Sequence, residues 1–306
     1  MRLSTSTSIL YQNKRFGRFY QVEDSIRLCA ESGFRHVDVN FYDQGLEGNP
    51  LARDGWEQWV DGLRQQAEAC GITIFQTHAF CYRTAESTDF TIDRPWFEER
   101  IRRSITASRM LGAEWTVIHP ADFSRDPEYS AEKCKAFNCE YWKPFVELGV
   151  RCGVGIAFEN MFQSGFKQRY CSEVDEIIGL ADSFHEDLVG ICWDTGHGAL
   201  SGQDQGEAIR KIGKRLKAMH VNDNHALPKQ DEHLMPFYGT VDWLTIMEAL
   251  KDIGYSHDFA YELKQATQTL PPELCGEMLR FLYDLLYPED IPTVQEFIGY
   301  CLIPSD

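Results

Sequence analysis

The stretch GICWDTGHGALSG, residues 190–202, decides the fold. An apolar segment with the character of a β-strand runs directly into Asp194, and His197 follows three residues later among small side chains. Short apolar segments of this kind are typical of buried strands, and longer amphipathic segments are typical of helices. The same succession of an apolar segment, a polar side chain and an amphipathic segment recurs along the chain. The stretch is therefore one unit of a repeated strand–helix pattern.

Eight strand-like segments alternate with helical segments. The expected strands are residues 6–10, 35–41, 72–78, 114–120, 154–160, 189–194, 217–223 and 258–264. The expected helices include residues 22–33, 56–71, 96–113, 141–153, 172–182, 206–216, 241–254 and 272–286. A βα alternation repeated eight times is what a closed (β/α)8 barrel of about 250 residues requires, and no glycine-rich phosphate-binding motif follows a strand. The sequence predicts an α/β protein, a single TIM-barrel domain over residues 1–306 with a C-terminal extension from about residue 288.

Composition narrows the functional classes. The 306 residues carry 47 acidic and 30 basic side chains, a net charge of −17. Because such a surface repels phosphates, we do not expect a nucleic-acid partner, and the basic cluster at residues 98–109 fits a solvated helix face. The ten cysteines are scattered without a CxxC pair, which predicts reduced thiols rather than a zinc finger or a disulfide scaffold. The chain shows neither a membrane-spanning apolar run nor a signal-peptide pattern, so we expect a cytoplasmic protein without a membrane partner.

Polar side chains stand where the expected strands end. They are His78, His119, Glu159, Asp194, His197, His220 and Glu262, with Asp231 and His233 in the loop after the seventh strand. Any one of them fits an ordinary surface group, and Asp194 fits the N-cap of the next helix. The carboxyl ends of barrel strands meet at one rim, however, so the whole set should converge. Histidine, Asp and Glu ligands without Cys suit Mn²⁺, Zn²⁺, Co²⁺ or Mg²⁺ in a catalytic rather than a structural site.

Five motifs then connect the chain to a known superfamily. They are FEN (158–160), WDTGH (193–197), MHVNDN (219–224), DEHLMPFYGTVDW (231–243) and YELK (261–264). In this order they resemble the xylose-isomerase-like superfamily of sugar isomerases and epimerases, which also contains endonuclease IV, over about residues 35–265. The resemblance implies one divalent ion held by Glu159, Asp194, His220 and Glu262. It also implies that Glu159 and Glu262 form the acid/base pair that moves a proton next to a metal-bound carbonyl, and that His197 and His233 bind substrate oxygens.

The endonuclease branch of the superfamily implies a different site. Three zinc ions would be held by His78, His119, Glu159, Asp194, His197, His220, Asp231, His233 and Glu262, and the protein would cleave a phosphodiester beside an abasic site. The acidic charge and the lack of basic, aromatic-rich loops favour a sugar instead. The loop DEHLMPFYGTVDW is also similar to the sugar-directed members, although Phe237 replaces the glycine expected after Pro236. A non-catalytic ligand-binding barrel is a third alternative, but it should lack one of the four core ligands, and none is missing.

The remaining expectations concern the substrate. The aromatic residues near strand ends are candidates for stacking on a sugar ring, with ordinary packing as the simpler interpretation: Tyr42, Phe80, Tyr82, Trp193, Phe237 and Tyr238. Arg83 and Lys264 are candidates to meet a phosphate or hydroxyl, or to neutralise the carboxylate-rich rim. We expect a metal-dependent isomerase or epimerase of a small sugar, sugar phosphate or polyol. Proteins that this chain resembles are often homo-oligomers.

Overall fold

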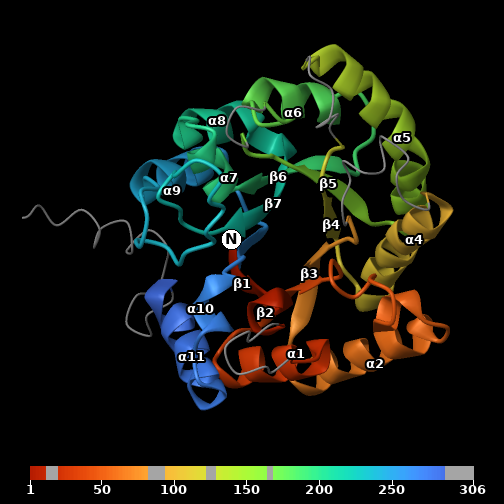
Figure 1. Cartoon of the computed structure of the whole chain (residues 1–306), viewed down its shortest axis with the longest axis vertical. Coiled ribbons are helices and arrows are strands. Elements are labelled where there is room, and N and C mark those ends of the chain that lie inside the picture. The colour runs from red at the N-terminus through yellow and green to blue at the C-terminus, as the bar shows by residue number, and fades with distance from the viewer. Residues whose placement is uncertain (12–19, 82–93, 122–128, 164–167, 287–306) are drawn as a thin grey trace, which may run out of the picture.

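The strands form a closed parallel barrel in chain order, β1 to β8, with the helices around it (Figure 1). The computed structural model describes residues 1–11, 20–81, 94–121, 129–163 and 168–286. Strand β1 closes the barrel against β8, with Leu3 opposite Phe259 and Thr5 opposite Tyr261. The strands are β1 (Arg2–Ser6), β2 (His36–Asn40), β3 (Thr73–His78), β4 (Trp115–Ile118), β5 (Gly155–Glu159), β6 (Val189–Asp194), β7 (Leu216–Val221) and β8 (Asp258–Tyr261). The predicted TIM barrel is confirmed.

Eight helices overlap the expected segments, but the helix expected at 141–153 begins at Ala131, and the short helices Thr195–Leu200 and Gln265–Gln268 were not expected. They are α1 (Val22–Glu31), α2 (Trp56–Ala69), α4 (Arg94–Leu111), α5 (Ala131–Cys152), α6 (Val174–Ala181), α7 (Thr195–Leu200), α8 (Gln205–Ile212), α9 (Trp243–Asp252), α10 (Gln265–Gln268) and α11 (Cys275–Leu286). Short 3-10 turns cover Thr7–Leu10, Pro50–Ala52, Gly213–Arg215 and Pro272–Leu274. On α5, the hydroxyl of Ser130 accepts a hydrogen bond from Lys133 N, and Gly153 ends the helix at φ +70°. Local capping chemistry therefore sets both ends of that helix.

The first strand lies earlier than the sequence predicts. Residues 6–10 were expected to form it, but the strand is Arg2–Ser6 and Thr7–Leu10 is a 3-10 helix. Ser6 caps this helix, because its hydroxyl accepts a hydrogen bond from Ser8 N. Ile9 and Leu10 are buried in the hydrophobic core from the turn, so their apolar character does not come from a strand. A short apolar run does not distinguish a strand from a buried turn.

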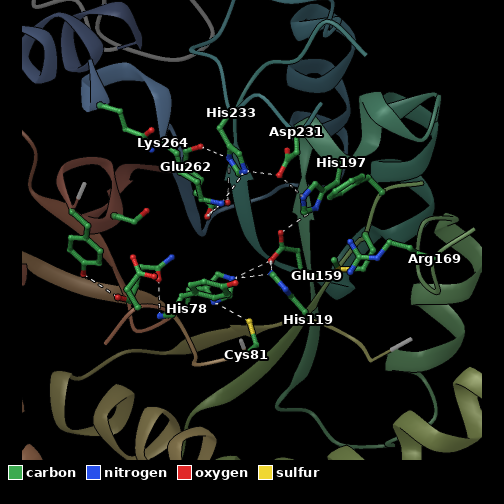
Figure 2. A pocket seen from close by; sticks show the side chains of 18 residues that line it. His78, Cys81, His119, Glu159, Arg169, His197, Asp231, His233, Glu262 and Lys264 are labelled. Atoms are coloured by element: carbon green, nitrogen blue, oxygen red, sulfur yellow. Dashed lines mark hydrogen bonds and ion pairs between the residues drawn. The ribbon is translucent and has the colours of Figure 1, made fainter. Parts of the chain in front are cut away.

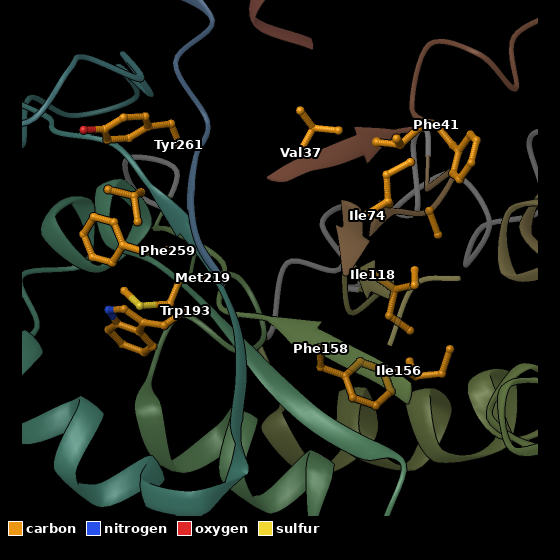
Figure 3. Packing of buried hydrophobic residues seen from close by; sticks show 14 of the residues in the cluster. Val37, Phe41, Ile74, Ile118, Ile156, Phe158, Trp193, Met219, Phe259 and Tyr261 are labelled. Atoms are coloured by element: carbon orange, nitrogen blue, oxygen red, sulfur yellow. The ribbon is translucent and has the colours of Figure 1, made fainter. Parts of the chain in front are cut away.

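Alternation along the strands separates two apolar layers. Outward-pointing side chains such as Ile156, Phe158, Trp193 and Met219 pack in the main core between barrel and helices (Figure 3). A second cluster of Trp115, Val117, Ala157, Cys192 and Ala218 fills the barrel interior. Because side chains alternate between the two faces of a strand, Glu159 follows Ala157 inward, Asp194 follows Cys192, and His220 follows Ala218. The same alternation that builds the core delivers these three polar groups to the inside of the rim.

The outer surface agrees with the charge analysis. The basic cluster at residues 98–109 lies on α4, where Arg102 and Arg103 pair with Glu98 and Glu99 one turn earlier. Arg102 and Arg109 are exposed, as a solvated helix face requires, whereas Arg100 and Arg103 are partly buried and donate to the backbone carbonyls of Ala52 and Leu51. Within the described ranges, no helix is long and apolar enough to cross a membrane. The C-terminal extension predicted from about residue 288 lies outside the described residues.

Candidate functional site

A cavity of about 510 Å³ opens at the carboxyl end of the barrel. Most of the predicted site residues line it, namely His78, His119, Glu159, His197, Asp231, His233 and Glu262 (Figure 2). Asp194 and His220 lie beneath these residues and are fully buried. The structure therefore brings together side chains from six strand ends and from the loop after β7. The predicted convergence is confirmed.

The four-residue core consists of Glu159, Asp194, His220 and Glu262. One potential ligand atom from each lies within 4.8 Å of the others, and all four side chains are buried. Nδ1 of His220 is 3.3 Å from Oε1 of Glu159 and 3.5 Å from Oε2 of Glu262. This nitrogen is buried and has no hydrogen-bond partner. Three buried carboxylates around an unpartnered imidazole nitrogen fit a divalent ion, because buried charges need an opposite charge or a metal.

Asp38 on β2 is a site residue that the sequence analysis missed. Its Oδ2 lies 3.4 Å from Nε2 of His220 and accepts a hydrogen bond of 2.7 Å from Nε2 of Gln76. A carboxylate on the outer nitrogen of a histidine fixes the ring so that the other nitrogen faces a metal. The available signal was an acidic residue inside the apolar segment HVDVN, residues 36–40, at a position where alternation points inward.

Asp194 has two local functions at once. Its Oδ1 accepts a hydrogen bond of 2.8 Å from His197 N, which makes it the N-cap of α7 as the sequence suggested. Its Oδ2 accepts a hydrogen bond of 3.0 Å from Nδ2 of Asn222. Asn160 accepts from the Asp194 backbone N–H at 2.6 Å. Burial, with the nearby charge of Glu159, raises the pKa of Asp194. Hydrogen bonds thus hold the Asp194 carboxylate in place although burial disfavours its negative charge. A bound cation would offset that cost.

A thiol joins two of the predicted histidines. His78 and His119 approach with their Nε2 atoms 3.2 Å apart, and Sγ of Cys81 lies 3.9 Å from Nδ1 of His78. Burial alone would raise the pKa of the Cys81 thiol, but the charges of His119 and His78 outweigh it and lower the pKa to about 6. The expected ligand set contained no cysteine, whereas the structure places Cys81 beside two of its histidines. The signal was the spacing of His78 and Cys81, three residues apart at a strand end.

The remaining predicted residues, His197, Asp231 and His233, lie next to one another and beside Lys264. Oδ2 of Asp231 lies 2.9 Å from Nε2 of His233 and 3.7 Å from Nε2 of His197. Lys264 places Nζ 3.0 Å from the same nitrogen of His233 and 3.3 Å from Oε1 of Glu262. Among the described residues, the groups able to hold a metal do not include the set of His197, Asp231 and His233. Lys264 thus neutralises carboxylates of the rim, one of the two functions considered for it.

The loop after β7 has Phe237 at the position where a glycine was expected. Phe237 adopts a left-handed backbone with φ +73°. Its N–H donates to Oδ2 of Asp223 at 2.9 Å, and the same carboxylate accepts from Val241 N and from the indole N–H of Trp243. Phe237 therefore takes the backbone conformation that glycine adopts most easily. Its side chain is half-exposed and Tyr238 is exposed, and neither lines the cavity.

Of the other described aromatic candidates, one lines the cavity and two are buried in the hydrophobic core. Tyr42 lines the cavity, whereas Phe80 and Trp193 are buried in the hydrophobic core. Tyr82 and Arg83 lie outside the described residues. The sequence analysis missed further lining residues, namely Ser8, Tyr11, Asn40, Asp43, Met161, Phe162, Arg169 and Gln268. Phe162 and Arg169 stand together, with the guanidinium carbon 5.3 Å from the ring centroid.

Comparisons with known proteins agree with this architecture. A protein of Sinorhizobium fredii named uncharacterized protein y4fM is 27% identical over 265 residues, covering 79% of this chain and 80% of the relative. The inosose isomerase of Bacillus velezensis is 23% identical over 251 residues, covering 79% and 83%.

Solved structures show the same fold. The IOLI protein with a binding zinc atom has a TM-score of 0.73 at 17% identity, covering 96% of this chain and all of that one. D-Psicose 3-epimerase in the presence of D-fructose has a TM-score of 0.72 at 15% identity, covering 94% and 98%. The family model described as xylose isomerase-like TIM barrel matches residues 26–285. The chain therefore belongs to the xylose isomerase-like TIM barrel family.

Proposed function

We propose that the chain is a divalent-metal-dependent isomerase or epimerase of a sugar, sugar phosphate or polyol. The observation that carries the proposal is the convergence of Glu159 and Glu262 on Nδ1 of His220, at 3.3 and 3.5 Å, beside a cavity of about 510 Å³. Inversion at a carbon atom by a two-base route uses two such groups, one to remove a proton and one to deliver a proton to the opposite face. The relatives named as sugar epimerases and inosose isomerases support the same class of reaction.

The residues of the four-residue core would hold one ion of Mn²⁺, Zn²⁺, Co²⁺ or Mg²⁺. When bound, the ion would polarise the substrate carbonyl and lower the pKa of the neighbouring C–H group. Asp194 and His220 would bind the metal and would not transfer protons, because Asp194 caps α7 and Asp38 holds the ring of His220. That division leaves the two glutamates to move the proton.

The surroundings of each glutamate favour the charged form that a base requires. Burial would raise the pKa of Glu262, but Lys264, His220 and His233 outweigh it and lower the pKa to about 2. Burial likewise opposes ionisation of Glu159, and His220 and His119 outweigh it, so its pKa lies well below the usual range. With one glutamate ionised as the base and the other protonated as the acid, delivery of the second proton from the opposite face would invert the centre, whereas return of the abstracted proton to the adjacent carbon would interconvert an aldose and a ketose. His197 and His233 would bind substrate hydroxyls at the cavity wall.

The two alternatives have less support. An endonuclease IV-like site with three zinc ions needs His197, Asp231 and His233 as ligands, but the ammonium of Lys264 stands 3.0 Å from Nε2 of His233. The net charge of −17 also opposes DNA binding. A non-catalytic barrel does not require two ionised glutamates at the same buried centre.

Exchange of the substrate α-proton with solvent tests the proposal. Metal-loaded protein would be incubated with a panel of ketoses and inososes in D₂O, and deuterium incorporation followed by NMR. We expect exchange with at least one substrate, and its loss in both Glu159→Gln and Glu262→Gln even at metal concentrations high enough to restore full metal content. Glu232→Gln is the matched control, because Glu232 pairs with His225 at the surface and does not line the cavity. Full exchange in both glutamine variants would contradict the acid/base assignment.

A further inference from the structure

One wall of the cavity is built from the first and last parts of the barrel. Asn40 ends β2, the 3-10 turn Thr7–Leu10 follows β1, and α10 follows β8. The hydroxyl of Thr267 on α10 donates to the backbone oxygen of Ile9 in that turn, and the hydroxyl of Tyr11 donates to the backbone oxygen of Asn40 at 3.0 Å. Hydrogen bonds thus join the three segments. We call their cavity-lining residues the amide wall, namely Ser8, Tyr11, Asn40 and Gln268.

Hydrogen bonds on both sides fix Asn40 on this wall. Its backbone N–H donates to Oγ1 of Thr7 at 3.1 Å, and its backbone oxygen accepts from Tyr11. Its side-chain Oδ1 accepts from the backbone N–H of Tyr42 at 2.9 Å. Because a backbone N–H can only donate, this bond identifies which end of the amide is the oxygen. The other end is therefore the NH₂ group, a donor held in a fixed direction.

This donor of Asn40 faces the cavity. Among the described residues, no atom accepts a hydrogen bond from its Nδ2. Asn40 is 4% exposed and lines the cavity, so the accessible part of its side chain lies there. Asn138, a buried asparagine of the core, instead donates from Nδ2 to the backbone oxygens of Ala121 and Cys134, both at 2.8 Å. A buried donor without a partner is costly, which indicates that the Nδ2 group serves a ligand.

Gln268 places a second amide on the same wall. It is the last residue of α10, its side chain is half-buried, and it lines the cavity. No hydrogen bond joins its side chain to the part of the chain that the structure describes. Each of the two amides offers hydrogen-bonding groups without a charge. The wall is therefore suited to a ligand with neutral polar groups.

The charges around the amide wall do not suit a phosphate. Asp43 lines the cavity three residues after Asn40. Burial raises the pKa of the Tyr11 hydroxyl, and the charge of Asp43 adds to the rise, so this carboxylate acts on the wall. The nearby cation, Lys264, is engaged by Oε1 of Glu262 at 3.3 Å. Proteins usually bind phosphate with Arg or Lys side chains, or at the start of a longer helix than α10.

We propose that Asn40 and Gln268 bind hydroxyl groups of the substrate, and that the amide wall selects an unphosphorylated sugar or polyol over a sugar phosphate. A hydroxyl both donates and accepts, which an amide matches without any charge. A phosphate would instead bring negative charge beside Asp43. The inference rests on the proposed function, because it takes the substrate to be a sugar or a polyol.

Calorimetric titration of the metal-loaded protein tests the selection. The probes are D-fructose, D-psicose, myo-inositol and D-fructose 6-phosphate. We expect at least one of the three uncharged probes to bind, and to bind more tightly than D-fructose 6-phosphate. Equal or tighter binding of the 6-phosphate, or no binding of any uncharged probe, would overturn the proposal.

Asn40→Ala tests the contact itself. It should weaken the binding of the preferred uncharged probe by about 3- to 10-fold, as expected for one neutral hydrogen bond. Monodeoxy analogues of that probe distinguish a contact from a change in the shape of the wall. One analogue should bind more weakly than its parent to the wild type, but equally well to Asn40→Ala. If the variant weakens the parent and every analogue by the same factor, Asn40 has only a structural role and the proposal fails.

Two further variants complete the set. Asn40→Asp keeps an acceptor for the backbone N–H of Tyr42, so it preserves the local fold, and its added charge should further weaken the binding of D-fructose 6-phosphate. Gln163→Ala is the matched control, because Gln163 donates to Glu173 at 3.3 Å and does not line the cavity. It should bind every probe as the wild type does.

These measurements follow binding and require no proton transfer. A protein that binds an uncharged probe through Asn40, yet exchanges no α-proton, would contradict the proposed reaction and support the amide wall. A protein that exchanges the α-proton of a ketose equally well in wild type and Asn40→Ala, with unchanged binding, would do the opposite. Failure of the inference and failure of the proposed function are therefore separate outcomes.

Discussion

The two ends of the barrel differ in what surrounds their buried carboxylates: an arginine at the amino end and histidines at the carboxyl end. At the amino end, Arg2 pairs with Asp258 at 2.6 Å and with Glu114 at 3.8 Å, and its guanidinium lies 3.7 Å from the ring centroid of Phe75. At the carboxyl end, buried carboxylates crowd around shared histidines, with Nδ1 of His220 lying 3.3 Å from Glu159 and 3.5 Å from Glu262. In TIM barrels the amino end generally serves stability and the carboxyl end serves chemistry. The contrast predicts that substitutions at the two ends will affect different measurements.

The largest expected effect is that of Asp194→Asn. The amide keeps the acceptor that caps α7 but removes a charge from the four-residue core. Loss of a residue that only contacts a metal ligand typically lowers metal affinity about 10- to 100-fold. Because Asp194 would itself be a ligand, metal affinity should fall by more than about 100-fold. Because burial and the neighbouring Glu159 raise the pKa of Asp194, its charge destabilises the metal-free fold. Metal-free Asp194→Asn should therefore unfold at a temperature equal to or above that of the wild type. Equilibrium dialysis and thermal unfolding in chelator measure the two effects, and unchanged metal affinity would refute the role of Asp194.

Asp38→Asn should produce a smaller loss in the same direction. The substitution removes the carboxylate that faces Nε2 of His220 at 3.4 Å and leaves all four core ligands in place. We expect metal affinity to fall by about 10- to 100-fold, as is typical when a histidine ligand loses its outer partner. High metal concentration should restore most of the proton exchange, which distinguishes a positioning residue from a catalytic one. An affinity within twofold of wild type would show that Asp38 does not orient the ring.

Arg2→Met should affect stability alone. It leaves Asp258 buried without its partner, at a cost of about 1–3 kcal/mol in the free energy of unfolding. Burial raises the pKa of Asp258 to about 6 in the folded protein, above its unfolded value. The stability that Asp258 provides is thus present at acid pH and lost as pH rises toward 6, and in Arg2→Met this loss extends to higher pH. Chemical denaturation from pH 4 to 8 should show a gap between the two proteins that widens with pH. Loss of metal binding by the folded variant would contradict the division between the two ends.

Features that follow from local sequence patterns were predictable, whereas contacts between side chains of different strands were not. The strand ends and the nine rim residues follow from local periodicity and motifs, so eight-fold alternation was sufficient to place them together. The inward position of Asp38 and the spacing of Cys81 from His78 are visible locally, but their partners, like the contact of Lys264 with His233, depend on which side chains of different strands meet. The first strand was misplaced because Ile9 and Leu10 are apolar for tertiary reasons, within a turn that packs into the core.

The smallest expected effect concerns the loop after β7, where Phe237 holds a left-handed backbone. Phe237→Gly relieves a strain of about 1 kcal/mol but adds a similar conformational entropy to the unfolded chain. The free energy of unfolding should change by less than ~1 kcal/mol, and proton exchange should not change. Gly239→Ala is the contrasting variant, because its Cβ would stand 2.5 Å from the Asn224 carbonyl oxygen and 2.3 Å from Oδ1 of Asp223. That variant should be clearly destabilised in urea denaturation. If Phe237→Gly were instead the more harmful change, the loop would depend on the phenyl ring rather than on the hydrogen bonds to Asp223.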